Sequence, residues 1–215
     1  MALALPFSHD AFLDVFGAYD SVLSPMVVAL WVVTAGLALR GMRKGQMDGR
    51  GIFALLAVHW GWSGIAYHWF FLRRITPAGA LFGALFVAQA ALFIWLAATS
   101  RAQFTMNRRL RGILGGALVC YGLLYPLVGF GFGLRYPRMP LFAVPCPTTL
   151  ITAGLLLTAA SLPRWVNIVP ILWAVLAISA AFVLGIWADL ALVGAGALLA
   201  VDTLAPHVFG RRLAS

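Results

Sequence analysis

The sequence predicts an all-α protein, a bundle of transmembrane helices that crosses a bilayer about seven times. Of the 215 residues, 63% are hydrophobic and only 10% are charged, and the mean hydropathy is +0.97. A soluble domain with a polar shell does not tolerate such a composition. Apolar runs of about 20 residues, the length that a helix needs to cross the hydrocarbon core, also recur along the chain.

The predicted spans follow one another with short connections, so residues 1–215 are predicted to form a single transmembrane domain. In residues 1–20, Phe12, Phe16 and Tyr19 recur at helical spacing, which predicts a short outer helix in the membrane interface. The last apolar run is too long for one crossing, and Gly185–Asp189 predicts the turn that divides it. Without that turn the count is six. The predicted spans are residues 22–39, 51–71, 78–99, 112–133, 147–162, 165–185 and 190–209.

The basic residues predict the orientation of the chain. The 15 Lys and Arg residues outnumber the 6 acidic ones, but they fall in short gaps between apolar runs, where they meet lipid headgroups and form no face for nucleic acid. Because cytoplasmic loops are enriched in Lys and Arg, we expect the N-terminus outside and the C-terminus inside. The predicted inner segments hold Arg40, Arg43, Lys44, Arg50, Arg101, Arg108, Arg109, Arg111, Arg164, Arg211 and Arg212, and the outer ones hold Arg73, Arg74, Arg135 and Arg138.

Three prolines interrupt the apolar stretch before the fifth span. Pro140, Pro145 and Pro147 predict that residues 140–148 are non-helical. Irregular backbone at membrane depth requires protein or a wet cavity around it, and transporters use short, interrupted spans to place a helix N-terminus beside a solute. We therefore expect this segment to line a small polar cavity.

Cys146 stands at the predicted N-terminus of the fifth span, where Thr148 and Thr149 would help to satisfy the free amides. A thiol in this position is a candidate to bind a soft metal or to react, with Tyr136 near it on the outer side. The alternative is that Cys146 packs as a small apolar residue.

The second span contributes His59 and His68 as further binding candidates, because ionisable groups inside a membrane are costly and face protein or water. Their separation of nine positions places them on opposite faces, so they do not share a metal. A structural role is the alternative for each. His59 would then form an interhelical hydrogen bond, with Gln89 as the expected partner, and His68 would belong to an interfacial aromatic belt.

The same stretches resemble a known family. The motifs that carry the resemblance are His59–Phe71, Ile75–Ala78, Leu81–Gly83, Tyr125–Leu127, Arg135–Pro137 and, most specifically, Pro145–Thr149. They are similar to DUF6064, an uncharacterised bacterial family of polytopic membrane proteins and a domain of unknown function. The resemblance implies a small multi-pass protein of the bacterial inner (cytoplasmic) membrane, and it supplies no substrate, cofactor or reaction.

Three classes of function remain open. The best supported is a small-solute or ion transporter or channel with its site near the interrupted fifth span. The alternative is an accessory subunit of a larger membrane complex or a homo-oligomer, for which Gly-rich faces are suited. The third is a membrane-embedded redox or thiol enzyme that uses Cys146 with His68 and Tyr136, but the sequence has no Glu and no recognisable nucleophile and base grouping. The expected partner is the lipid bilayer, without nucleic acid, and no cofactor is indicated.

Overall fold

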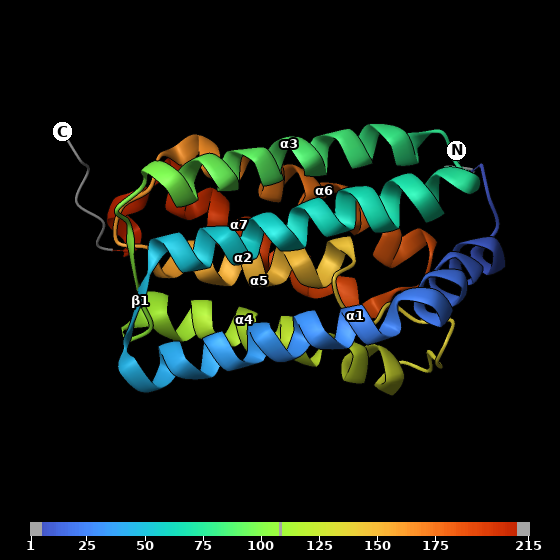
Figure 1. The fold of residues 1–215 in the computed structure, drawn as a ribbon, viewed down its shortest axis with the longest axis horizontal. Helices are drawn as coiled ribbons and strands as arrows, with labels where there is room; N and C mark the ends of the chain where they lie inside the picture. The colour runs from blue at the N-terminus through green and yellow to red at the C-terminus, as the bar shows by residue number, and fades with distance from the viewer. Residues whose placement is uncertain (1–5, 108, 210–215) are drawn as a thin grey trace.

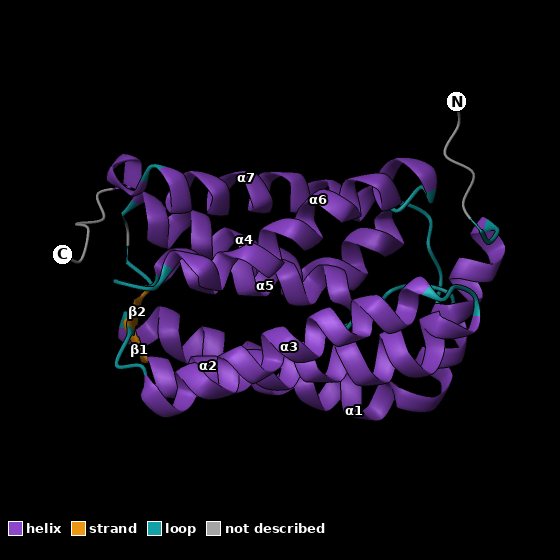
Figure 2. Ribbon diagram, turned by 90° about the horizontal axis from the view of Figure 1, so that it is seen from above, coloured by secondary structure: helices purple, strands orange, loops and turns teal. Residues whose placement is uncertain are grey.

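The computed structural model describes residues 6–107 and 109–209, and within these ranges the protein is all-α apart from one pair of short strands. The helices run along the long axis of the bundle (Figures 1 and 2). They are α1 (His9–Lys44), α2 (Gly49–Trp62), α3 (Ala78–Thr99), α4 (Leu110–Gly131), α5 (Pro145–Thr158), α6 (Ile168–Val183) and α7 (Leu190–Leu204).

The antiparallel strands β1 (Gln46–Asp48) and β2 (Gln103–Thr105) pair at one end of the bundle, which we call the strand end. Phe104 of β2 also forms a bridge with Ala159, so β2 joins the connection between α1 and α2 to the residue that follows α5. The opposite end, where α1 begins, contains the cavity that is described below, and we call it the cavity end (Figure 1).

Five helical segments are long and apolar enough to span a membrane. They are His9–Lys44, Ala78–Thr99, Leu110–Gly131, Arg164–Val183 and Trp187–Leu204. Large apolar side chains cover their outer surfaces: Leu81 is 70% exposed, Leu127 is 68% exposed and Leu204 is 81% exposed. Apolar surface of this extent is stable against lipid and not against water, so the structure has the features of an integral membrane protein.

The predicted second span is helical, but its geometry changes midway. The α-helix α2 ends at Trp62 and continues directly into the π-helix η1 (Ser63–Phe71), which a short turn of 3-10 helix, η2 (Leu72–Arg74), follows. Gly64 in η1 lies directly against the backbone of Gly83 on α3, a close approach that small residues allow between membrane helices. π-Helical segments recur at functional sites, and η1 carries both Tyr67 and His68.

Residues 9–20 form the first turns of α1 and not a separate short helix. Ser8 begins the helix, since its hydroxyl accepts a hydrogen bond of 3.1 Å from the amide of Ala11. Phe16 and Tyr19 are buried, and both rings pack against Tyr67 of η1, which holds these turns on the bundle. Pro25 stands inside α1, and Figure 1 shows the first turns inclined to the rest of the helix, as expected when a proline removes one backbone hydrogen bond.

The fifth helix begins two residues earlier than predicted. α5 starts at Pro145, so only residues 140–144 of the predicted irregular segment are non-helical. Proline is tolerated there because the first amides of a helix have no intrahelical partner. Every residue of α5 except Cys146 is buried, which makes α5 the central helix of the bundle.

The predicted turn between the last two helices is confirmed. α6 ends at Val183, Gly185 adopts the left-handed conformation with φ 63°, and the 3-10 turn η4 (Trp187–Asp189) leads into α7. A left-handed backbone is accessible to glycine without steric cost. This turn brings Asp189 to the cavity end, beside the start of α5.

Candidate functional site

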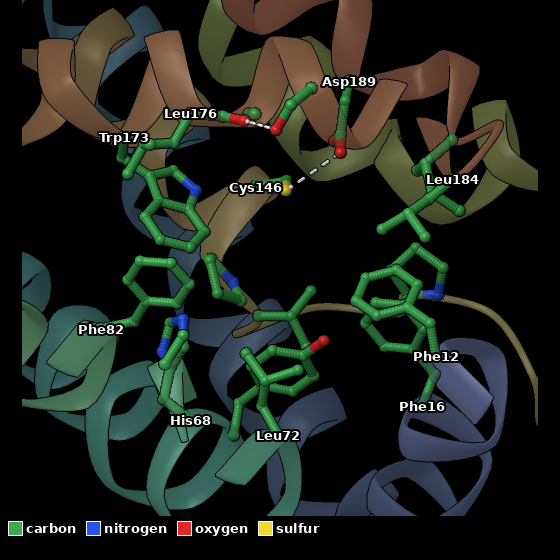
Figure 3. Close-up of a pocket in the computed structure, with 18 of the residues that line it drawn as sticks. Phe12, Phe16, His68, Leu72, Phe82, Cys146, Trp173, Leu176, Leu184 and Asp189 are labelled. Carbon is green, nitrogen blue, oxygen red and sulfur yellow. Dashed lines mark hydrogen bonds between the residues drawn. The ribbon is translucent and has the colours of Figure 1, made fainter. Parts of the chain in front are cut away.

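A cavity of about 270 Å³ lies at the cavity end of the bundle, beneath the first turns of α1 (Figure 3). Its walls come from α1, η1, α3, α4 and α6, and from the two irregular helix starts, those of α5 and η4. The lining is mostly apolar and aromatic, not polar as the sequence suggested. Its few groups with hydrogen-bonding or acid–base chemistry include His68, Tyr125, Cys146 and Asp189. An apolar cavity with a few convergent polar groups is the usual form of a small-molecule site.

Asp189 is the centre of the polar cluster. Only 2% of the residue is exposed, and both of its carboxyl oxygens are hydrogen-bonded. Tyr125 donates to Oδ1 through its hydroxyl, and Cys146 donates to Oδ2 through its thiol, with 3.3 Å between sulfur and oxygen. Both donors are neutral, and the ion pairs found among the described residues do not include Asp189. A buried carboxylate without a cationic partner is costly in a membrane, which makes Asp189 a candidate functional residue.

The carboxyl group of Asp189 also lies at the N-terminal end of α5, because Cys146 is the second residue of that helix. The free amides and the dipole of a helix favour negative charge at this end. The two threonines do not cap the helix as predicted. Thr149 donates to the carbonyl oxygen of Pro145 at 2.9 Å, and the hydroxyl of Thr148 lies 3.3 Å from that of Ser63. The acidic group that lies at the N-terminus of α5 is thus the side chain of Asp189.

His68 lies on the cavity wall opposite Asp189 (Figure 3). The residue is fully buried and packs against Phe86 and Trp173, with ring centroids 4.6 Å and 5.3 Å away, so it is not part of an exposed interfacial belt. Its Nδ1 lies 2.9 Å from the carbonyl oxygen of Ser63. Because a carbonyl oxygen only accepts, Nδ1 carries the hydrogen, and Nε2 of the neutral ring presents a lone pair. Nε2 has no hydrogen-bond partner among the described residues.

His59 takes the structural role that the sequence offered as its alternative. It is fully buried, its Nε2 lies 2.9 Å from the hydroxyl oxygen of Thr34 on α1, and its ring packs against Phe142. The expected partner was wrong: Gln89 instead donates to the carbonyl oxygen of Val166 at 3.3 Å. The reason is that α1, and not α3, packs on the side of α2 that carries His59. Neither His59 nor Gln89 lines the cavity.

The remaining candidates do not add to the site. Tyr136 is 58% exposed in the connection between α4 and α5 and does not line the cavity. Within residues 6–107 and 109–209, no group of three or more His, Cys, Asp or Glu side chains is placed to hold a metal ion. The thiol of Cys146 contacts the carboxyl group of Asp189, and two donor groups are too few for the soft-metal site that the sequence suggested.

The comparison with known families agrees with the resemblance seen in the sequence. A family model described as "Family of unknown function (DUF6064)" matches residues 9–215. The chain belongs to this family. No curated protein and no solved structure matches the chain. The match to DUF6064 extends over all seven α-helices and therefore includes every member of the polar cluster.

Asp189, Tyr125 and Trp173 line the cavity but were not among the sequence-predicted site residues. Asp189 was assigned only to a turn, and Tyr125 and Trp173 were given no role. A signal for Asp189 was present, because it is an acid within a long apolar run, and such an acid is a functional candidate by default. No comparable signal existed for Tyr125 and Trp173, since only the packing of α4 and α6 shows what their side chains meet.

Proposed function

We propose that this protein binds a small solute in the cavity of Figure 3 and carries it across the membrane. The observation that supports this function is the meeting of two irregular helix starts, those of α5 and η4, at a cavity lined by a buried carboxyl group. Transporters place their solutes at such interrupted helices, where backbone and side-chain groups are free to bind.

The proposed topology has seven crossings, with α2–η1 and the short α5 added to the five long apolar segments. The connections at the strand end contain most of the described basic residues, so this end is proposed to lie in the cytoplasm. The cavity then opens toward the outer side of the bacterial inner membrane. An accessory subunit would not need a polar cluster on a cavity, and a thiol enzyme would need the thiolate of Cys146 to develop beside the carboxyl group of Asp189, so transport is preferred over both alternatives.

The first turns of α1 form the proposed cover of the cavity. Phe12 and Phe16 line it from this side, and Arg138, in the connection between α4 and α5, holds the cover closed. Its guanidinium lies 3.0 Å from Asp10 and 2.8 Å from Asp14. Both pairs are exposed, and exposed ion pairs contribute at most about 1 kcal/mol each. These two ion pairs are therefore weak, and opening of the cover also requires Phe16 and Tyr19 to separate from Tyr67.

The test is transport by the purified full-length chain in proteoliposomes. Ala177 lines the cavity on α6, whereas Val175 on the same helix is 57% exposed and does not line it. Solutes are first screened for their effect on thermal unfolding, and uptake of those that stabilise the protein is then measured. We expect Ala177→Phe to abolish both effects and Val175→Phe to preserve them. Full uptake by a well-folded Ala177→Phe protein would overturn the proposal.

A further inference from the structure

We propose that the cavity selects a protonated amine with a small aromatic body and a hydrogen-bond donor at its far end. The inference rests on the proposed solute site, but it concerns binding and does not require transport. Three features of the described cavity carry it: the buried carboxyl group of Asp189, the aromatic walls, and the free Nε2 of His68 on the opposite side.

The charge of the cavity favours a cation. None of the described residues that line the cavity is Lys or Arg, so an anionic solute would meet Asp189 without compensation. Each carboxylate oxygen has two lone-pair sites, and Tyr125 and Cys146 each use one of them. Sites for an ammonium N–H therefore remain, and a bound ammonium group would supply the positive charge that the buried carboxylate lacks.

The walls suit the body of such a molecule. Phe82 and Trp173 meet edge to face with centroids 5.3 Å apart on one side, and Phe16 stacks on Tyr67 at 5.4 Å. Figure 3 shows Phe82 and Trp173 across the cavity from Phe12 and Phe16. Aromatic faces attract ammonium groups and pack well against an apolar ring. The cavity is smaller than the roughly 300–1,000 Å³ of pockets for drug-sized ligands, so a single ring is the appropriate size.

His68 adds a second point of recognition. Its Nε2 is buried on the cavity wall with no hydrogen-bond partner among the described residues, and a buried acceptor without a donor costs free energy. Because His68 and Asp189 lie on opposite sides of the cavity, the donor that His68 requires belongs to the end of the solute remote from the ammonium group. Tyramine, which has an ammonium group at one end and a phenolic hydroxyl at the other, is the matching probe.

Four probes separate the contributions: tyramine, phenethylamine without the hydroxyl, neutral para-ethylphenol, and anionic para-hydroxyphenylpropionate. Binding to the full-length protein in lipid nanodiscs is measured by titration calorimetry at neutral pH. We expect tyramine to bind at least about tenfold more tightly than para-ethylphenol and a few-fold more tightly than phenethylamine, and the anion to bind weakest. Binding of the anion as tight as that of tyramine would overturn the inference.

Two variants assign the roles. Asp189→Asn is expected to reduce the advantage of tyramine over para-ethylphenol to less than about threefold, and His68→Phe to remove the advantage of tyramine over phenethylamine. If either variant fails to fold, the probe series on the unmodified protein decides the matter alone. Tyramine binding without uptake leaves this inference standing and overturns transport, whereas uptake of an anion through the same cavity does the reverse.

Discussion

The thiol of Cys146 donates a hydrogen bond to Oδ2 of Asp189, a residue 43 positions further along the chain, with 3.3 Å between the two atoms. This bond joins the start of α5 to the turn before α7. Tyr125 donates to the other oxygen of the same carboxyl group, which adds α4 to the cluster. Three helices are thus connected through one buried acid, so changes to its partners should be felt as changes in stability.

Tyr125→Phe removes one of the two neutral donors to Asp189. We expect a loss of about 1–3 kcal/mol in the free energy of unfolding, because a buried carboxyl group is left with an unsatisfied oxygen. Tyr121→Phe is the matched control one turn earlier on α4, where the hydroxyl donates to the partly buried carbonyl oxygen of Ala188 at 3.0 Å. Denaturant unfolding in detergent measures both. Equal losses in the two variants would contradict the central position given to Asp189.

The contact between α4 and α5 depends on two glycines. A side chain at Gly115 would meet the backbone of Gly154, whereas a side chain at the next residue, Gly116, would meet nothing within 4 Å. We therefore expect Gly115→Ala to destabilise the protein by about 1–3 kcal/mol through overpacking. Gly116→Ala should be neutral or slightly stabilising, since alanine favours helix more than glycine does. The measurement is thermal unfolding of the two variants in the same detergent. If Gly115→Ala leaves the stability unchanged, α4 and α5 can move apart here at little cost.

Much of the fold follows from local properties of the sequence. Apolar runs and their breaks located each helix to within a few residues at most ends, and the third span was predicted with the bounds Ala78–Thr99 that the structure shows. The exception is α1, where a predicted interfacial segment proved continuous with the first span. Its continuity depends on the packing of Phe16 and Tyr19 against Tyr67, a contact that joins distant parts of the chain.

The candidate site was predicted less completely than the helices, because it also depends on contacts between distant parts of the chain. The irregular segment before α5 correctly indicated the place of the cavity and the presence of Cys146 on its wall. The partners were wrong, because hydrophobic periodicity fixes which residues form helices and not which helices pack together. Only that packing brings Asp189 to Cys146 and Thr34 to His59.

The bond between His59 and Thr34 gives a third prediction. His59→Gln retains a side chain that can hydrogen-bond and should stay close to the parent in stability, whereas His59→Leu should lose about 1 kcal/mol. Thr34→Val removes the other partner, so a double-mutant cycle with His59→Leu should show a coupling energy of about 0.6 kcal/mol. Additive effects in that cycle would mean that the contact contributes nothing to stability.

The last prediction tests the orientation on which access to the cavity depends. Arg74 follows η1 at the cavity end, and Lys44 ends α1 at the strand end, next to β1. In a background in which Cys120 and Cys146 are replaced by Ser, Arg74→Cys and Lys44→Cys each provide a single reactive thiol. Because Lys and Arg gather at the strand end, an impermeant maleimide added to intact cells should label position 74 and spare position 44. Labelling of both positions after permeabilisation is the control that both thiols are accessible. Labelling of position 44 alone in intact cells would place the cavity on the cytoplasmic side, and the solute would then have to enter from the cytoplasm.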